Sequence, residues 1–230
     1  MDLDTLILNT IEGFFPFVEN KIYPYIVFEG IVGCGKSTQA RLLFSFLNEK
    51  YPNSVLLTKE PGGSEVADSI RKIAQGTSFN EEMNPYTEAY LYAASRAQTL
   101  RNVVLPNLNQ GKIVISDRSF LSSLAFQGYG RNLGFENVLL INKVAVSVMP
   151  GLVIYLDVPP EIAVKRANDK KGDKFESMNL EFHNRVLKGY EEIFKRNLVP
   201  YVKIDGNRKI EQVFEDVKKS ALSFLEKINY

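Results

Sequence analysis

The chain has 230 residues, of which 45% are hydrophobic and 24% are charged, a composition typical of one folded α/β domain and not of a disordered chain. The formal net charge of +1 lacks the basic excess of nucleic-acid-binding and membrane-surface proteins, so we expect neither nucleic acid nor membrane as a partner. The single cysteine, Cys34, excludes an intramolecular disulfide, and the single histidine, His183, argues against a multi-histidine metal site. His183 falls in a polar helical pattern, which predicts a position on the surface.

Residues 1–22 precede the first predicted strand and contain no motif that carries chemistry. The spacing of Leu3, Leu6, Ile7 and Ile11 is compatible with a short amphipathic helix in an N-terminal extension, which leaves 23–230 as a single domain. The start of the chain is acidic, and polar residues interrupt its apolar stretches. We therefore expect neither a secretory signal nor a membrane span, and a cytoplasmic location.

An apolar run at 25–28 leads into G-x-x-x-x-G-K-S at 30–37, and a helical pattern follows from 38 to 50. This strand–loop–helix context is that of a P-loop, whose backbone N–H groups point at phosphate oxygens. Lys36 can reach the β- and γ-phosphates, and the Ser37 hydroxyl can hold Mg²⁺. The sequence predicts a nucleoside triphosphate site formed by Gly30, Ile31, Val32, Gly33, Cys34, Gly35, Lys36, Ser37 and Thr38.

Further apolar runs at 54–58, 112–117, 152–157 and 202–205 predict strands. The predicted helices span 66–75, 84–109 with a kink at Pro106, 137–149, 160–167, 180–197 and 210–227. Strands alternate with helices, and most strand runs are too apolar to face water. We therefore expect an α/β fold with a five-stranded parallel sheet covered by helices on both faces. Ligands of such sheets bind beyond the carboxyl ends of the strands.

Two residues with ligand-binding side chains follow the strand predicted at 112–117. Asp117 stands where a P-loop protein holds its Mg²⁺-organising carboxylate, so we predict a metal site formed by Ser37 and Asp117. Arg118 offers a planar guanidinium for a phosphate. The alternative interpretation is an Asp–Arg pair that closes a helix N-terminus.

Tyr92 and Arg96 are four residues apart in a predicted helix and share one face, where they can present an aromatic ring and a cation to a ligand. A tyrosine at helical spacing is, however, more often part of a core. Segment 165–174 holds five basic and two acidic residues around Gly172. This composition suits a lid, at about 168–176, that closes over phosphates, and a solvated charged loop is the alternative.

Together these features resemble the thymidylate kinases, P-loop nucleoside monophosphate kinases that phosphorylate dTMP with ATP. The resemblance extends from about residue 25 to the last predicted helix. It rests on the P-loop itself, on T-K-E-P-G-G-S at 58–64, Y-A-A-S-R-A-Q at 92–98, D-R-S at 117–119, F-Q-G at 126–128 and D-K-F-E at 173–176. The E-P-G-G form and the Q-G pair are typical of bacterial members.

The resemblance implies a role for individual residues of this chain. Tyr92 corresponds to the aromatic residue that stacks on thymine, Arg96 to an arginine that contacts the base, and Arg118 to one that binds phosphates. The nucleoside pocket would be completed by Pro61, Arg71, Ser123, Phe126 and Gln127. Arg166 and the lid would cover ATP, and the catalytic cations would be Lys36, Arg118, Lys170 and Lys171. The same resemblance implies Mg²⁺ as cofactor, ATP and dTMP as substrates, and a homodimer.

The chain departs from the family pattern at three places. The family usually has Asp or Glu at the position of Val32, where the acid helps to orient the sugar end of dTMP. Animal-type members have an arginine at the position of Gly33, and the lid segment that often reads D-R-F-E has Lys174 in place of arginine. Because lysine keeps the charge but loses the bidentate fork, we expect a slower enzyme and not an inactive one.

Two other functions remain open at this point. A relative that phosphorylates another monophosphate or a deoxynucleoside is favoured by Val32 and by the N-terminal extension. A nucleotide-binding module without turnover is the other alternative, because a motif does not prove catalysis. Against that module, the chain keeps Lys36, Ser37, Asp117 and Arg118.

Overall fold

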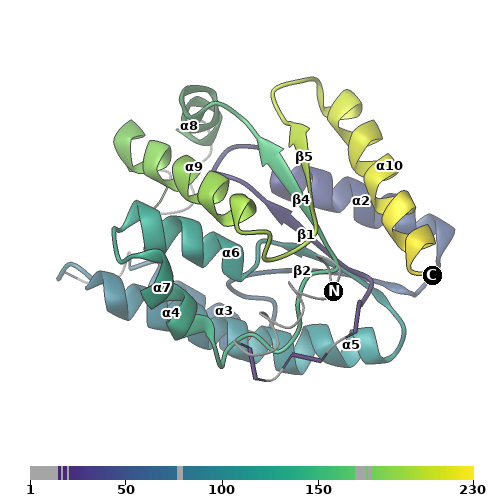
Figure 1. Cartoon of the computed structure of the whole chain (residues 1–230), viewed down its shortest axis with the longest axis horizontal. Coiled ribbons are helices and arrows are strands. Elements are labelled where there is room, and N and C mark those ends of the chain that lie inside the picture. Colours follow the sequence, from purple (N-terminus) through teal and green to yellow (C-terminus); the bar gives the residue numbers. More distant parts are fainter. Residues whose placement is uncertain (1–14, 17, 20, 77–79, 169–174, 176–177) are drawn as a thin grey trace.

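The computed structural model describes residues 15–16, 18–19, 21–76, 80–168, 175 and 178–230. These residues form a five-stranded sheet with the strand order β2-β3-β1-β4-β5 (Figure 1). Every pairing is parallel. The strands are β1 (Tyr25–Glu29), β2 (Val55–Lys59), β3 (Ile113–Asp117), β4 (Leu152–Asp157) and β5 (Tyr201–Asp205). The predicted fold class is therefore confirmed.

The three central strands form the core of the molecule because their side chains are apolar on both faces. All five residues of β1 are buried, and β3 and β4 are buried up to their last residue. The last residue of each of these strands is Glu29, Asp117 or Asp157, so the polar residues gather at the carboxyl edge of the sheet. This edge is where a parallel sheet binds ligands.

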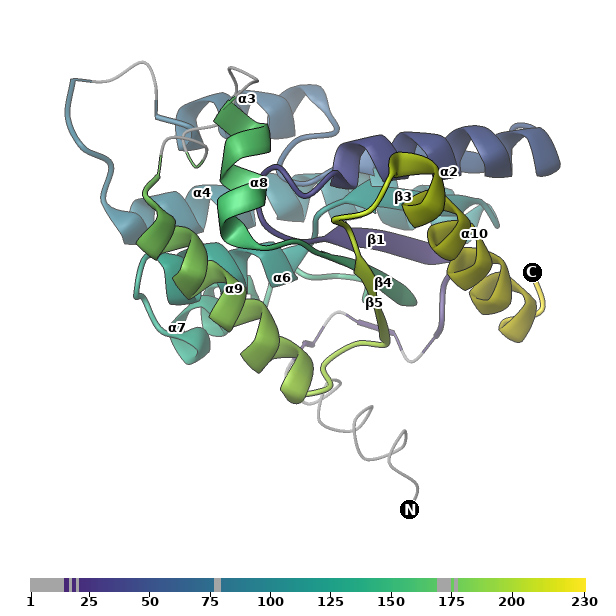
Figure 2. The same ribbon diagram turned by 90° about the horizontal axis from the view of Figure 1, so that it is seen from above.

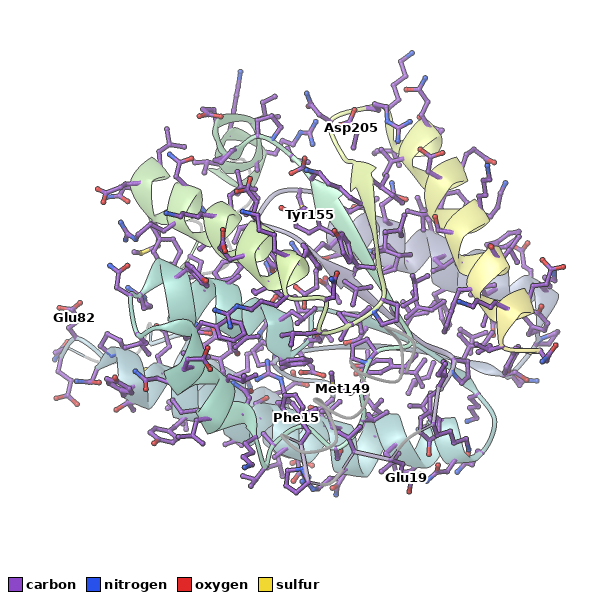
Figure 3. The ribbon with its side chains drawn as sticks, in the orientation of Figure 1. Phe15, Glu19, Glu82, Met149, Tyr155 and Asp205 are labelled. Atoms are coloured by element: carbon purple, nitrogen blue, oxygen red, sulfur yellow. The ribbon has the colours of Figure 1, made fainter. Side chains whose placement is uncertain are left out.

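Helices cover both faces of the sheet (Figure 2). On one face α2 (Lys36–Lys50) and α10 (Ile210–Lys227) pack against each other. The remaining helical segments are α3 (Glu65–Ala74), α4 (Pro85–Thr99), η1 (Leu100–Val104), α5 (Leu105–Asn109), α6 (Phe120–Ser123), η2 (Leu124–Gly130), α7 (Phe135–Asn142), α8 (Pro160–Asn168) and α9 (Leu180–Lys195). Tyr155 of β4 lies beneath α9 (Figure 3), with its ring 5.1 Å from Tyr190 and 4.9 Å from Phe194.

The sequence analysis missed the helical segment formed by α6 and the π-helical η2. Every residue from 120 to 128 is buried, so the segment has no polar face and lacks the amphipathic period that marks a surface helix. Its start is nevertheless encoded locally, because the Ser119 side chain caps the helix by accepting a hydrogen bond from the Leu121 N–H.

Two predicted helix boundaries differ from the observed ones. The helix predicted at 137–149 begins at Phe135 and ends at Asn142, and the carbonyls of Val144 and Ala145 instead accept hydrogen bonds from Arg101. The kink predicted at Pro106 is present as the π-helical η1 immediately before α5. A proline cannot donate the backbone hydrogen bond that a continuous helix requires there.

The predicted surface position of His183 is wrong. Its side chain is only 1% exposed and meets the Phe182 ring edge-on. His183, Val186 and Tyr190 recur at the spacing of one helix face, and all three are buried. Burial lowers the pKa of the His183 imidazole. The position of His183 in the helical period therefore indicates that it is buried. The polarity of its neighbours in the sequence indicates the opposite and is misleading.

The described part of the N-terminal extension lies against the domain. Phe15 is buried, and its ring meets Phe120 edge-on at 5.4 Å (Figure 3). The Tyr23 hydroxyl lies 3.0 Å from both the Glu19 carboxylate and the Asn109 amide oxygen. The amphipathic helix expected within 1–22 falls mainly on residues 1–14, which lie outside the described residues. Among the described helices, none is both long and apolar enough to cross a membrane.

Candidate active site

The P-loop joins β1 to α2 and requires its glycines for steric reasons. Gly30, Gly33 and Gly35 all have positive φ angles, of 143°, 80° and 99°. A Cβ atom on Gly33 would collide with the carbonyl oxygen of Ala163 in α8. The arginine that animal-type relatives have at this position therefore does not fit between the loop and α8.

The P-loop lysine lies inside the loop. The Lys36 ammonium donates to the Ile31 carbonyl at 2.7 Å and lies 3.4 Å from the Cys34 sulfur. Burial and the positive charge of Arg118 lower the pKa of Lys36. The Lys36 ammonium is thus held inside the loop by one backbone carbonyl and the Cys34 sulfur, and its predicted contact with phosphates stays a prediction.

The predicted metal ligands meet at the carboxyl edge of the sheet. The Ser37 hydroxyl donates directly to Oδ2 of Asp117. The second carboxylate oxygen, Oδ1, is buried and has no hydrogen-bond partner among the described residues. A hydroxyl oxygen and an unpaired carboxylate oxygen are hard ligands of the kind that Mg²⁺ prefers. The donor set therefore fits a magnesium ion that receives its other ligands from water and phosphate.

A buried carboxylate at the end of β1 organises the loop that follows β3. Glu29 accepts hydrogen bonds from the Ser119 backbone N–H and hydroxyl, both at 2.8 Å. It also accepts from the Ser122 hydroxyl at 2.6 Å and from the Tyr190 hydroxyl at 2.8 Å. Glu29 thereby ties together the P-loop strand, α6 and α9.

Arg118 lies between the P-loop and the segment that contains Ser122 and Phe126. Its Nη1 donates to the Gly30 carbonyl at 3.1 Å and to the Ser122 hydroxyl at 2.9 Å, and its guanidinium lies 4.9 Å from the centre of the Phe126 ring. Burial alone would lower the pKa of Arg118, but the neighbouring Tyr190 and the carboxylates of Asp117 and Glu29 raise it. The backbone at Arg118 has a φ of 81°, in the left-handed region that non-glycine residues seldom adopt.

A cavity adjoins Arg118, and its lining includes all of the substrate-binding residues predicted from the sequence. It is small, at about 40 Å³. Its lining consists of Glu60, Pro61, Arg71, Tyr92, Arg96, Arg118, Ser122, Ser123, Phe126, Gln127 and Phe175. The Ser123 hydroxyl is buried here without a hydrogen-bond partner among the described residues, so it is available to a ligand. Arg71 donates to the Pro61 carbonyl at 2.7 Å, which fixes the rim of the cavity.

Arg96 is held by a buried network. Its Nε lies 2.6 Å from Oε2 of Glu60, and both side chains are 1% exposed. Its Nη1 donates to the Asn142 side chain and its Nη2 to the Ser119 carbonyl at 3.1 Å. Arg96 therefore fixes the position of several elements around the cavity in addition to lining it.

Phe175 forms an aromatic wall of the same cavity. Its ring stacks on Phe182 at 5.8 Å and meets Phe126 at 5.1 Å and Tyr92 at 6.2 Å. Phe175 belongs to the D-K-F-E block at the end of the predicted lid, whereas Lys170, Lys171 and Lys174 lie outside the described residues. Phe175 thus forms an aromatic cluster with Phe182, Phe126 and Tyr92 at this cavity.

Arg166, predicted to bind ATP, lies at the end of α8. Its guanidinium donates to the Gly206 carbonyl at 3.2 Å and to the Asn207 side chain at 3.0 Å. A Cβ atom on Gly206 would lie 3.4 Å from the Cys34 carbonyl, so this loop is close to the P-loop. Arg166 therefore anchors a loop beside the P-loop.

A larger cavity of about 330 Å³ opens at the metal end of the site. Ser37, Asp117 and Thr58 line it, together with the apolar side chains of Ala40, Leu56, Leu57 and Val103 and the cations Arg41 and Lys59. The hydroxyl of Thr58 is buried and has no hydrogen-bond partner among the described residues. Asp117 lines this larger cavity, and the next residue, Arg118, lines the smaller one.

Sequence reasoning missed several carboxylates and one phenol that hold the site together, namely Glu29, Glu60, Glu88 and Tyr190. Glu60 directly follows β2 within the T-K-E-P-G-G-S block, yet nothing in its immediate sequence identifies Arg96 as its partner. Glu88 stands four residues before Tyr92 on the same helix, so helical spacing could have found it.

The family model and the curated relatives that match this chain all belong to one family. The thymidylate kinase family model matches residues 28–217. The chain is 39% identical over 194 residues to the thymidylate kinase of Thermoanaerobacter sp. (strain X514), covering 84% of this chain and 94% of that protein. It is 43% identical over 192 residues to the thymidylate kinase of Finegoldia magna, covering 83% and 93%.

A solved structure extends this similarity to the fold. The crystal structure of thymidylate kinase from Ehrlichia chaffeensis superposes with a TM-score of 0.71 at 30% sequence identity, covering 85% of this chain and 97% of that one. The family model spans the P-loop, the acceptor cavity and the lid region described above. This chain therefore belongs to the thymidylate kinase family.

Proposed function

We propose that the protein transfers the γ-phosphoryl group of ATP to dTMP and releases dTDP and ADP. The observation that carries the proposal is the position of Arg118, whose guanidinium bonds to the P-loop at Gly30 and also lies over Phe126 in the acceptor cavity. One cation thereby contacts both the donor loop and the acceptor cavity. Phosphoryl transfer requires such positioning and charge neutralisation more than it requires a general base.

On the donor side, residues 30–38 bind the triphosphate through their backbone N–H groups. Lys36 and Arg118 balance the charge on the transferring group, and Arg166 orients the loop beside the nucleotide. Ser37 and Asp117 hold Mg²⁺, which neutralises phosphate charge when bound. The direct Ser37–Asp117 hydrogen bond and the unpaired Oδ1 of Asp117 support this assignment.

On the acceptor side, dTMP occupies the cavity lined by Tyr92, Phe126 and Gln127, with Arg71 and Arg118 close to its phosphate. Cavities that bind small molecules usually enclose about 300–1,000 Å³. The acceptor cavity, at about 40 Å³, must therefore widen when the nucleotide binds. Lys170 and Lys171 close over the phosphates as lid cations. A double alanine variant at these positions tests that role, because full turnover would exclude it.

A coupled assay of ADP release with dTMP tests the proposed function. We expect ADP release to depend on both Mg²⁺ and dTMP, and Lys36→Met to lower kcat by about two to three orders of magnitude. Binding of ATP and dTMP without ADP release would instead identify a nucleotide-binding module. ADP release at the same rate without an acceptor would identify an ATPase.

A different acceptor is the second candidate, favoured by Val32. This buried valine replaces the acid that relatives direct at the sugar of dTMP. The same assay with dUMP, UMP and thymidine distinguishes the candidates. A higher kcat/KM for any of them than for dTMP would support a changed acceptor.

We also propose a homodimer in the cytoplasm, where ATP is available. Exposed apolar side chains on the packed pair α3 and α4 support a self-association face, and they include Val66, Ile73, Tyr86 and Tyr90. Light scattering after gel filtration should show a dimer that Tyr90→Lys weakens. Ile210→Lys, which changes an equally apolar exposed position on α10, should leave the mass unchanged.

A further inference from the structure

Glu88 is a buried carboxylate that contacts Gln127, one of the residues that line the acceptor cavity. It lies on α4 four residues before Tyr92 and eight before Arg96, so all three side chains point from the same face of the helix. Its side chain is 1% exposed. The Gln127 amide donates its Nε2 to Oε1 of Glu88 at 2.9 Å, and Arg131 donates Nη2 to Oε2 at 3.0 Å.

This contact fixes the orientation of the Gln127 amide. An ionised carboxylate can only accept hydrogen bonds, so the amide must turn its nitrogen towards Glu88. Its oxygen then faces away from Glu88. Gln127 itself is 1% exposed and lines the acceptor cavity, so its amide has no bulk solvent in which to rearrange. Turning the amide over would place its oxygen against the Glu88 carboxylate, which is unfavourable for two buried acceptors.

We propose that Glu88 is a positioning residue that sets the base specificity of the acceptor site through Gln127. The inference rests on the proposed function. Thymine and uracil present a ring N–H beside a carbonyl oxygen, whereas cytosine presents a ring nitrogen acceptor beside an amino group. An amide held with its nitrogen towards Glu88 offers its oxygen to the ring N–H of thymine. To pair with cytosine, the amide would have to take the opposite orientation, which Glu88 prevents.

Arg131 balances the charge of Glu88. The Arg131 side chain is 21% exposed, and its guanidinium lies 5.6 Å from the ring centres of both Phe175 and Phe182. Arg131 donates to both carboxylate oxygens of Glu88, from Nη2 to Oε2 at 3.0 Å and from Nε to Oε1 at 3.4 Å. Arg131 and Gln127 thus both donate to the Glu88 carboxylate, and Gln127 transmits the orientation of this contact to the ligand.

The test is the ratio of kcat/KM for dTMP to that for dCMP. Glu88→Gln keeps the shape of the side chain but can donate a hydrogen bond, so Gln127 can turn over. We expect the ratio to fall at least tenfold, with a raised KM for dTMP and an unchanged KM for ATP. The acceptor dUMP should follow dTMP, because uracil has the same hydrogen-bonding edge. A role limited to holding α4 against η2 would lower stability or kcat for all acceptors equally and leave the ratio unchanged.

Two further variants keep the test decisive if Glu88→Gln does not fold. Arg131→Gln removes the ion pair but leaves the Glu88–Gln127 contact, so it should keep the ratio. Gln127→Leu removes the amide and should lower the ratio by itself. Where Glu88→Gln folds, adding it to Gln127→Leu should change the ratio no further. An unchanged ratio in Glu88→Gln or in Gln127→Leu overturns the inference. Failure of the wild-type protein to phosphorylate dTMP would instead overturn the proposed function.

Discussion

Arg96 and Glu60 form an ion pair that is closed to solvent, with 2.6 Å between Nε and Oε2 and both side chains 1% exposed. The Tyr25 hydroxyl donates to the other Glu60 oxygen at 3.2 Å. Burial and the negative charge of Glu60 raise the pKa of Tyr25, so this hydroxyl keeps its proton. The pair therefore connects the sheet core to the acceptor cavity.

Replacing Glu60 by glutamine should lower the free energy of unfolding by about 3–5 kcal/mol, because the Arg96 charge would remain buried without its counter-ion. Urea denaturation measures this change. Lys59→Gln is a matched control, since it breaks the adjacent pair with Asp68, whose side chains are 51% and 41% exposed. An exposed pair contributes only about 0–1 kcal/mol. Equal losses in the two variants would contradict the assignment of Arg96–Glu60 as a structural pair.

Gly33→Ala should destabilise the fold by more than the cost of placing alanine at a positive φ. Gly33 and Gly111 have the same φ of 80°, but a Cβ atom collides with α8 at Gly33 and meets nothing within 4 Å at Gly111. We expect Gly33→Ala to lower the free energy of unfolding by about 1–3 kcal/mol more than Gly111→Ala, and to raise the KM for ATP. Gly111→Ala should leave that KM unchanged. If the two variants had the same free energy of unfolding and the same KM for ATP, the loop would have to move freely away from α8.

His183 should make the protein sensitive to acid. Its pKa in the folded chain is lowered by burial, so as the pH falls the unfolded chain takes up the proton first. The free energy of unfolding should then decrease below about pH 6.5, the usual pKa of histidine. His183→Phe removes the titrating group, and the difference in stability between the two proteins should be constant above pH 7 and change as the pH falls. A difference that does not vary with pH would refute this prediction.

Val32→Asp should improve the recognition of dTMP. Val32 is 8% exposed in the P-loop, where relatives have an acid directed at the sugar. A new hydrogen bond worth about 1 kcal/mol corresponds to a roughly fivefold lower KM for dTMP. The melting temperature should fall at the same time, because a carboxylate replaces a buried valine. Val32→Thr serves as the isosteric control. An unchanged or higher KM would show that Val32 faces away from the sugar.

Local patterns predicted the strand, loop and helix of the P-loop well, because these elements are encoded in consecutive residues. The strand, the glycines, Lys36 and Ser37 all lie within 25–38. The helical spacing of Tyr92 and Arg96 likewise predicted that they share a cavity, and both line it. The family resemblance then selected Ser123, Phe126 and Gln127 from a segment whose helix the sequence pattern did not reveal.

The partners of these residues could not be predicted in the same way. Glu29 and Tyr190 are far apart in the sequence. Only the folding of α9 over the sheet brings the Tyr190 hydroxyl to 2.8 Å from Oε2 of Glu29. Every residue from 120 to 128 is buried, so this segment lacks the polar face from which a helix is recognised. For His183, the polar neighbours indicate a surface position, whereas the helical period it shares with Val186 and Tyr190 indicates burial. Long-range contacts and full burial are thus the two features that the local pattern did not contain.

The left-handed backbone of Arg118 has a consequence for engineering. Strain of this kind costs about 1–3 kcal/mol, and glycine at the same position would relieve it. At position 118 the backbone therefore prefers glycine, whereas the proposed chemistry requires the guanidinium. A library selected only for heat resistance would enrich substitutions that remove the guanidinium that contacts Gly30 and Phe126. Selection for stability should keep this position fixed and screen every survivor for turnover.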